Sequence, residues 1–169
     1  ENKINEDDGC DSIMMMLVDM ENPGLVVLPT HRIVFGIEGF DFNRISKDAT
    51  EYFDIEKVAS YSLLKEKMDE GFENNLKVFG CYTSGEYYLF TLKAKISEIK
   101  ELADMDTSLS NLDVTVLHSL ILEKYLGIDK ENMAKQINLT YTRDLDEAFS
   151  AAENYANCCF ILNPTRVSE

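Results

Sequence analysis

Two short segments of similar composition follow apolar stretches of this chain. Residues 28–32 read Leu-Pro-Thr-His-Arg, and residues 162–166 read Leu-Asn-Pro-Thr-Arg. Proline fixes the local backbone, threonine offers a hydroxyl, and arginine offers a planar fork of donors for carboxylate or phosphate. Because ligand-binding groups commonly lie at strand ends, the repeated pattern predicts an anion pocket. The side chains expected to form it are Thr30, His31, Arg32, Thr165 and Arg166.

The pocket depends on how the two segments are arranged. Two neighbouring strands that run in the same direction would bring Arg32 and Arg166 to one rim of a sheet. The alternative is that each segment is an ordinary strand exit, whose arginine pairs with one of the many carboxylates. The composition favours that alternative, because 31 acidic residues face 16 basic ones and the net charge is −15.

The two histidines of the chain are the other candidates for ligand contact. The ordinary pKa of histidine, about 6.5, suits His31 to proton transfer or to contact with a phosphate. The alternative for His31 is a hydrogen-bonded structural role. His118 lies in an expected helix among apolar neighbours, so it is either a buried structural histidine or a further ligand contact. The chain lacks the ligand spacing of a zinc site, so we expect no metal, and no catalytic residue or cofactor is identified.

Apolar runs and turn signals predict the elements that must position these side chains. They indicate an α+β fold, with a mixed, largely antiparallel sheet of about six or seven strands and helices packed on it. The unbroken apolar run at residues 13–20 predicts a strand buried on both faces, and therefore central in the sheet. Further strands are expected at residues 25–28, 33–35, 53–59, 76–82, 87–92, 137–141 and 158–162. Helices are expected at residues 42–53, 60–70, 96–104, 112–126, 130–135 and 145–155.

Polar residues and glycine mark the ends of several expected helices. Asp113 and Asp144 are interpreted as helix-start residues, which the positive end of the helix dipole favours. Gly71 is expected to end the helix at residues 60–70. The 169 residues correspond to about one domain. We expect an acidic flexible leader at residues 1–11 and a single α+β domain at residues 12–169, cut from a longer protein.

Composition excludes several classes of partner. The acidic balance argues against direct nucleic-acid binding and against an anionic membrane surface. No apolar run reaches the ~18 residues of a transmembrane helix. The four cysteines show no Cys-x-x-Cys spacing and predict buried thiols in a reducing compartment, so we expect a cytoplasmic protein. The partners that remain are a phosphorylated small molecule, the remainder of its own chain and a second copy in a homodimer.

Four short motifs, the first two of them in two parts, resemble a known family when they are taken in chain order. They lie at residues 14–18, 24–32, 116–118, 126–128, 141–144 and 160–166. Together they are similar to the C-terminal half of a bacterial and archaeal family of unknown function, whose members are sometimes labelled ParB-like or sporulation-partition regulators. The resemblance covers residues 10–169. It implies a full-length protein about twice this size, with an Asp-Gly-His-His-Arg motif upstream and a Met-Pro-x-Lys-Ser-Thr motif downstream.

The resemblance also implies a class of ligand. Some ParB-like folds bind nucleotides and some phosphorylate free serine, and members of this family often lie beside serine-biosynthesis genes. The leading hypothesis is therefore part of a site for a phosphorylated or carboxylated small molecule, such as a nucleotide or a serine-pathway metabolite. The alternative is a regulatory or protein-interaction module of a partition-type protein, without catalysis in this segment. A third possibility is a structural half-domain that completes the fold of the rest of the protein.

Overall fold

Six strands form one sheet at the centre of the structure. The computed structural model describes residues 14–17, 27–103 and 105–165. In chain order the strands are β1 (His31–Val34), β2 (Phe53–Val58), β3 (Val78–Thr83), β4 (Glu86–Leu92), β5 (Leu139–Thr142) and β6 (Cys158–Leu162). Their order across the sheet is β2-β4-β3-β6-β1-β5, and every neighbouring pair runs antiparallel. The predicted α+β fold is therefore confirmed, with six strands where a mixed, largely antiparallel sheet of about six or seven was expected, and with every described pair antiparallel.

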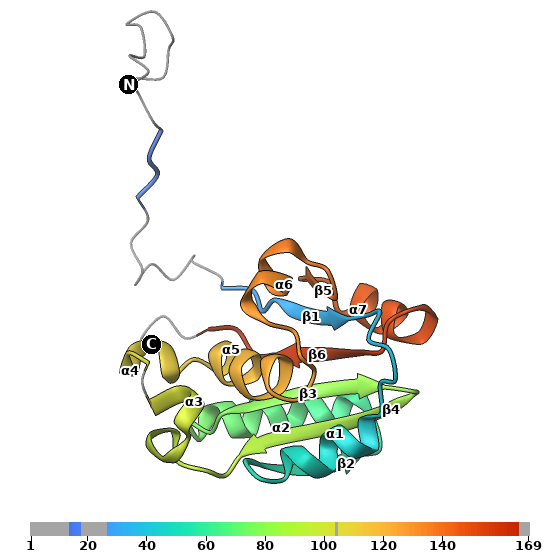
Figure 1. The fold of residues 1–169 in the computed structure, drawn as a ribbon, viewed down its shortest axis with the longest axis horizontal. Helices are drawn as coiled ribbons and strands as arrows, with labels where there is room; N and C mark the ends of the chain where they lie inside the picture. The colour runs from blue at the N-terminus through green and yellow to red at the C-terminus, as the bar shows by residue number, and fades with distance from the viewer. Residues whose placement is uncertain (1–13, 18–26, 104, 166–169) are drawn as a thin grey trace, which may run out of the picture.

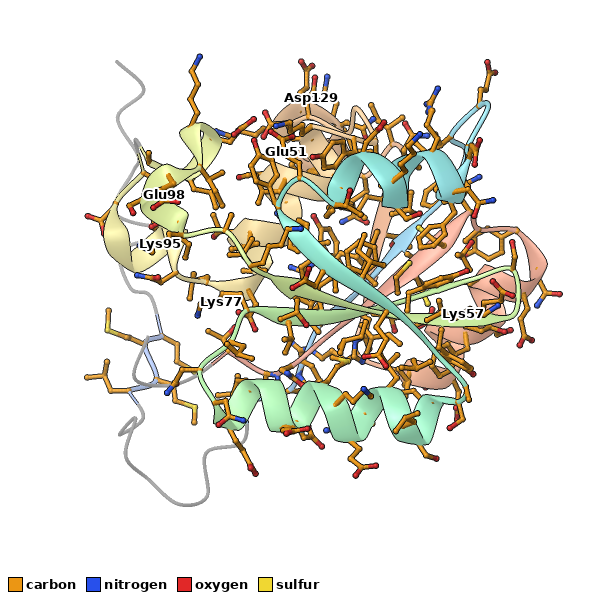
Figure 2. The ribbon with its side chains drawn as sticks, turned by 90° about the horizontal axis from the view of Figure 1, so that it is seen from below. Glu51, Lys57, Lys77, Lys95, Glu98 and Asp129 are labelled. Carbon is orange, nitrogen blue, oxygen red and sulfur yellow. The ribbon has the colours of Figure 1, made fainter. Side chains whose placement is uncertain are left out.

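Helices cover both faces of this sheet, as Figure 1 and Figure 2 show. One face carries α2 (Tyr61–Glu73) and α7 (Leu145–Asn154). The other carries α1 (Phe42–Ala49), the short α5 (Asp113–Val116) and the π-helix η2 (Leu117–Glu123). The remaining helical segments are η1 (Ile96–Glu98), α3 (Lys100–Ala103), α4 (Thr107–Ser110) and α6 (Lys130–Lys135). Successive side chains of a strand point to opposite faces. Because helices cover both faces of the sheet, the central strand β3 is buried along its whole length.

Local sequence explains where several elements turn or begin. Ser84 and Gly85, between β3 and β4, both have positive φ, 51° and 79°, as a two-residue type I′ hairpin requires. Asp144 caps α7, because its side chain accepts hydrogen bonds from two backbone N–H groups of the first turn. Asp113 is the first residue of α5, where no side-chain cap is made. Its carboxylate is thus turned to other contacts.

Residues 14–17 form no strand, so the central strand predicted from the apolar run is wrong where the structure describes it. Their four side chains are between 72% and 100% exposed. The interior of the sheet offers them no place, because β4, β3, β6 and β1 already fill every position between the edge strands β2 and β5. An unbroken apolar run shows that a segment avoids water, but it does not identify the surface that covers it.

The strand expected at residues 25–28 is also wrong in its described part. Val27 and Leu28 have irregular backbone and are exposed. The rest of that segment and the expected leader at residues 1–11 lie outside the described residues. Among the helices that the structure describes, none is both long enough and apolar enough to span a membrane.

Gly71 lies inside α2 rather than at its end, because close packing on the sheet requires a residue without a side chain. α2 continues to Glu73, two residues beyond the glycine. A Cβ atom at Gly71 would lie 2.8 Å from Cγ1 and 3.0 Å from Cγ2 of Val78 on β3. Rotation about χ1 is restricted in valine because its side chain branches at Cβ. The methyl groups of Val78 therefore cannot move aside easily. The glycine therefore sets how closely α2 approaches β3.

We expect Gly71→Ala to lower the free energy of unfolding, by about 1–3 kcal/mol, because the new methyl group overpacks the contact with Val78. In an exposed helix interior the same change would raise the free energy of unfolding by about 1 kcal/mol. A decrease on Gly71→Ala would therefore indicate the close approach of α2 to β3. Urea unfolding measures the difference. In a Val78→Ala background, where space has been opened, Gly71→Ala should cost less. Equal costs in the two backgrounds would contradict the proposed contact.

Candidate functional site

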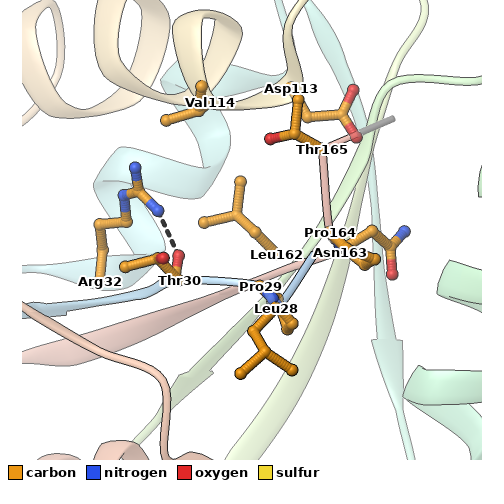
Figure 3. Close-up of a pocket in the computed structure, with 10 residues that line it drawn as sticks. All are labelled: Leu28, Pro29, Thr30, Arg32, Asp113, Val114, Leu162, Asn163, Pro164 and Thr165. Atoms are coloured by element: carbon orange, nitrogen blue, oxygen red, sulfur yellow. Dashed lines mark hydrogen bonds between the residues drawn. The ribbon is translucent and has the colours of Figure 1, made fainter. Parts of the chain in front are cut away.

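The pairing of β1 with β6 brings the two Pro-Thr segments to the same edge of the sheet. The strands run antiparallel, with Arg32 opposite Phe160. Parallel strands were the arrangement expected to bring the two segments together. The antiparallel pair does so instead, because residues 28–30 precede β1 and residues 163–165 follow β6. Between them lies a cavity of about 100 Å³, the β1–β6 cavity. Figure 3 shows the residues that line it, Leu28, Pro29, Thr30, Arg32, Asp113, Val114, Leu162, Asn163, Pro164 and Thr165.

Arg32 supplies a buried positive charge to this cavity, since only 9% of the residue is exposed. Its Nε donates a hydrogen bond to Nε2 of His118 at 3.3 Å, and its Nη1 donates to the backbone carbonyl of Thr30. The guanidinium carbon lies 5.2 Å from the ring centroid of Tyr141 on β5, which is a cation–π contact. Burial lowers the pKa of Arg32, but a guanidinium remains charged in proteins. Among the described residues, no carboxylate forms a salt bridge with it.

His118 holds the guanidinium from the opposite layer, on η2. Burial, and then the positive charge of Arg32, lower the pKa of His118 from 6.5 to about 4. The imidazole is therefore neutral at pH 7, with one ring nitrogen free of a proton. Because Nε of Arg32 donates to Nε2, Nε2 is that acceptor and the proton is on Nδ1. π-Helical turns are rare and often occur at functional sites. In this protein the π-helix η2 carries His118, whose Nε2 accepts the hydrogen bond that orients Arg32.

His31 points to the other face of the sheet, because it is the neighbour of Arg32 on the same strand. Its Nδ1 accepts a hydrogen bond from the backbone N–H of Leu162 at 3.4 Å. Burial, and then the charge of Arg32, lower the pKa of His31. His31 is buried and does not line the β1–β6 cavity. Its observed contact joins the start of β1 to the end of β6.

The cavity has a second charged wall opposite Arg32. Figure 3 shows Asp113 and Thr165 across the cavity from Arg32 and Thr30. Oδ1 of Asp113 also lies 3.6 Å from Nζ of Lys77, and the side chains of this pair are only 13% and 15% exposed. Arg32 and Asp113 thus line opposite sides of the cavity, and Figure 3 shows the carboxylate of Asp113 turned away from Arg32, with Thr165 on the nearer side.

The structure thus brings together some of the side chains expected from the sequence and separates others. Thr30, Arg32 and Thr165 line one cavity, and His118 contacts Arg32. Arg166 lies outside the described residues. Among the described residues, no group of three or more His, Cys, Asp or Glu side chains is arranged to hold a metal ion.

Sequence reasoning missed two residues of the site, Tyr141 and Asp113. Tyr141 lies against Arg32 because the two residues are paired in the register of β1 and β5. Asp113 reaches the cavity because α5 begins above the end of β6. Both placements depend on contacts between distant parts of the chain, and no local pattern in the sequence signals them.

Comparison with known proteins corrects the resemblance drawn from the short motifs. The model of a family described as "Protein of unknown function (DUF1015)" matches residues 1–115. Nothing in this match indicates a ParB-like or sporulation-partition protein, so that assignment is wrong. The motifs behind it are each only a few residues long, and matches this short do not establish a family. Searches of curated proteins and of solved structures found no match to the chain.

We expect the stability of the protein to fall between pH 7 and pH 5, in part through His118. Its pKa is about 4 when folded and 6.5 ordinarily. In this window the unfolded chain binds the proton and the folded chain does not. The free energy of unfolding is therefore fully retained above pH 6.5 and decreases as the pH falls, by up to about 2 kcal/mol at pH 5.

The measurement is urea unfolding of the wild type and of His118→Gln at pH 7 and pH 5. Glutamine can still accept from Arg32 but does not titrate, so the variant should lose less stability on acidification. The carboxylates and His31 titrate in both proteins and cancel in the comparison. An equal loss in wild type and variant would show that His118 is not held neutral by its surroundings.

Proposed function

The chain belongs to the DUF1015 family of proteins of unknown function, and on that premise we propose that it binds the phosphate or carboxylate group of a small molecule in the β1–β6 cavity. The observation that carries the proposal is the charge state of Arg32. Leaving a buried ion without a counter-charge is costly. In so acidic a chain, a carboxylate partner for this arginine is easily supplied, yet the described residues provide none. We propose that an external anion takes that place.

The donors around Arg32 support this proposal. A guanidinium has five N–H donors, and His118 and the carbonyl of Thr30 engage two nitrogens of Arg32. These contacts hold the planar group in one orientation, which suits two-point binding of carboxylate or phosphate. The hydroxyls of Thr30 and Thr165 line the same cavity and can add neutral donors. Prior orientation of the donors reduces the entropy lost on binding.

The size of the cavity limits what it can enclose. Pockets for drug-sized ligands have volumes of about 300–1,000 Å³, whereas this cavity measures about 100 Å³. It fits an anionic head group or a very small metabolite rather than a complete nucleotide. Cys81, Cys158 and Cys159 are free and buried thiols, which supports the further proposal of a reducing, cytoplasmic location.

We expect Arg32→Gln to abolish stabilisation of the protein by small anions. The assay is a thermal-shift panel of inorganic phosphate, sulfate, 3-phosphoglycerate and a nucleoside monophosphate on the full-length protein. A ligand present at 100 times its Kd stabilises the folded state by about 2.7 kcal/mol, which is readily visible in Tm. Arg32→Gln removes the charge and leaves two N–H donors in place of five, so the shift should disappear.

The matched control is Arg143→Gln, which removes the same charge from an exposed position outside the cavity. It should keep the wild-type response. Arg166→Gln, alone and combined with Arg32→Gln, tests whether the second arginine of the sequence pattern contributes. The proposal fails if no compound stabilises the wild type, or if Arg32→Gln responds as Arg143→Gln does.

The exposed apolar segment at residues 14–17 supports a second candidate function, that of a protein-interaction module that pairs with a second copy of the chain. Met14, Met15, Met16 and Leu17 are contiguous, and their exposure leaves a large apolar surface in water. Contiguous exposed patches of this kind commonly mark interaction sites. Burying them against a partner would stabilise the assembly at about 25 cal/mol per Å² of apolar surface.

For this candidate we expect the wild type to form dimers at micromolar concentrations and Met15→Ser/Leu17→Ser to be monomeric. Light scattering after size-exclusion chromatography measures the mass of each. Ile137→Ser is the control, because Ile137 is an exposed apolar residue elsewhere on the chain. A monomeric wild type would refute the dimer, and a dimer that persists in the double variant would place the interface elsewhere.

A further inference from the structure

We propose that Met14, Met15 and Met16 form an oxidation site, at which hydrogen peroxide converts apolar thioethers into polar sulfoxides and thereby prevents pairing with a second copy. The loss of pairing rests on the second candidate function, whereas the oxidation itself does not. The three residues, here called the methionine segment, are consecutive and are 100%, 72% and 83% exposed. Peroxide dissolved in water can therefore reach each of their sulfur atoms without any opening of the fold.

Other methionines of the described chain are shielded to different degrees. Met68 on α2 is 1% exposed, and its sulfur would lie 3.1 Å from a Cβ atom placed on Gly80 of β3. Met105 and Met133 are partly buried against the core. Oxidation follows the access of the reagent to the sulfur, and a buried side chain becomes accessible only when the structure opens. The structure therefore predicts an order of reactivity, with the methionine segment first and Met68 last.

The reaction requires no catalytic side chain, because a thioether attacks peroxide directly. The sulfur forms a bond to one oxygen while the O–O bond breaks, and the other oxygen leaves as water after a proton is transferred to it. The sulfur loses two electrons, which the peroxide gains. The product is a sulfoxide, which is polar where the thioether was apolar. A methionine sulfoxide reductase restores the thioether, so the modification is reversible.

Sulfoxides change the property of the methionine segment on which pairing depends. Association with a second copy is favoured because apolar surface leaves water. A sulfoxide oxygen accepts hydrogen bonds from water, and burying a polar group without a new partner is costly. Because the three sulfur atoms belong to consecutive residues, their oxidation acts on the same interface. Oxidation at this site therefore favours the monomer.

The first test measures the rate of oxidation of each methionine in the full-length protein. The protein is treated with hydrogen peroxide, and peptide mapping by mass spectrometry follows each residue. We expect the methionine segment to react about tenfold or more faster than Met68, with Met105 and Met133 between them. The protein is kept dilute, so that any dimer has dissociated and the rates do not depend on pairing. Equal rates at Met68 and in the methionine segment would overturn the assignment of the site.

The second test measures the mass of the protein before and after oxidation. Light scattering after size-exclusion chromatography is applied at micromolar concentration. Dithiothreitol is added after the peroxide, because it reverses disulfides and leaves sulfoxides in place. We expect a dimer before oxidation and a monomer once the methionine segment has been converted.

A triple variant separates the chemistry of sulfur from the apolar surface. Met14→Leu/Met15→Leu/Met16→Leu keeps side chains that are apolar and similar in volume, but none of the three can form a sulfoxide. This variant should remain a dimer after treatment with peroxide. The matched control is Met105→Leu/Met133→Leu, which removes methionines elsewhere and should dissociate as the wild type does.

The outcomes separate this inference from the second candidate function. A wild type that is monomeric before oxidation would overturn the pairing, and the rates would still decide whether the methionine segment is the oxidation site. A dimer that survives complete oxidation of the methionine segment would overturn the effect on pairing. Dissociation of the triple variant by peroxide would place the responsible oxidation elsewhere. Selective oxidation, with dissociation only where the methionine segment is intact, supports the inference.

Discussion

Backbone hydrogen bonds between β1 and β6 join the two ends of the described chain near the middle of the sheet. This pairing fixes which face of the sheet each side chain of β1 points to. It directs Arg32 toward η2 and His31 toward the opposite face, where Nδ1 of His31 accepts from the backbone of β6. It also places the segments before β1 and after β6 side by side. The cavity, its positive wall and its narrow volume all follow from one strand register.

The contacts inside the site are those of the buried guanidinium of Arg32. A neutral acceptor at His118, a carbonyl at Thr30 and the face of Tyr141 orient Arg32 without neutralising it. The acidic side chain on the same cavity is held at the opposite wall beside Lys77. Among the described residues, Arg32 and Asp113 form no ion pair with each other, and Asp113 pairs with Lys77. The charge of Arg32, which no carboxylate of the described residues balances, underlies the proposed function.

Much of the fold could be predicted from local patterns. The hairpin β3–β4, the capped helix α7 and the final strand β6 follow from turn residues, capping side chains and short apolar runs. Errors arose where a long-range contact decides the outcome. Gly71 reads as a helix end unless Val78 is known to lie against it, and the apolar residues 14–17 read as core although the sheet has no interior place for them. Within the site, the Pro-Thr-Arg pattern drew attention to Thr30, Arg32 and Thr165, but Asp113 and Tyr141 became visible only with the register and the helix positions.

The position of β6 also has a consequence for how the molecule is made. Among the described strands, β6 comes last in sequence, yet it lies between β3 and β1. While the chain emerges from a ribosome, β1 cannot complete its central hydrogen bonds until residue 162 has been synthesised, and the hairpin β3–β4 must wait with one edge uncovered. Such non-local closure slows folding relative to helical domains of similar size. The β1–β6 cavity depends on the same pairing, because its lining includes residues that precede β1 and residues that follow β6.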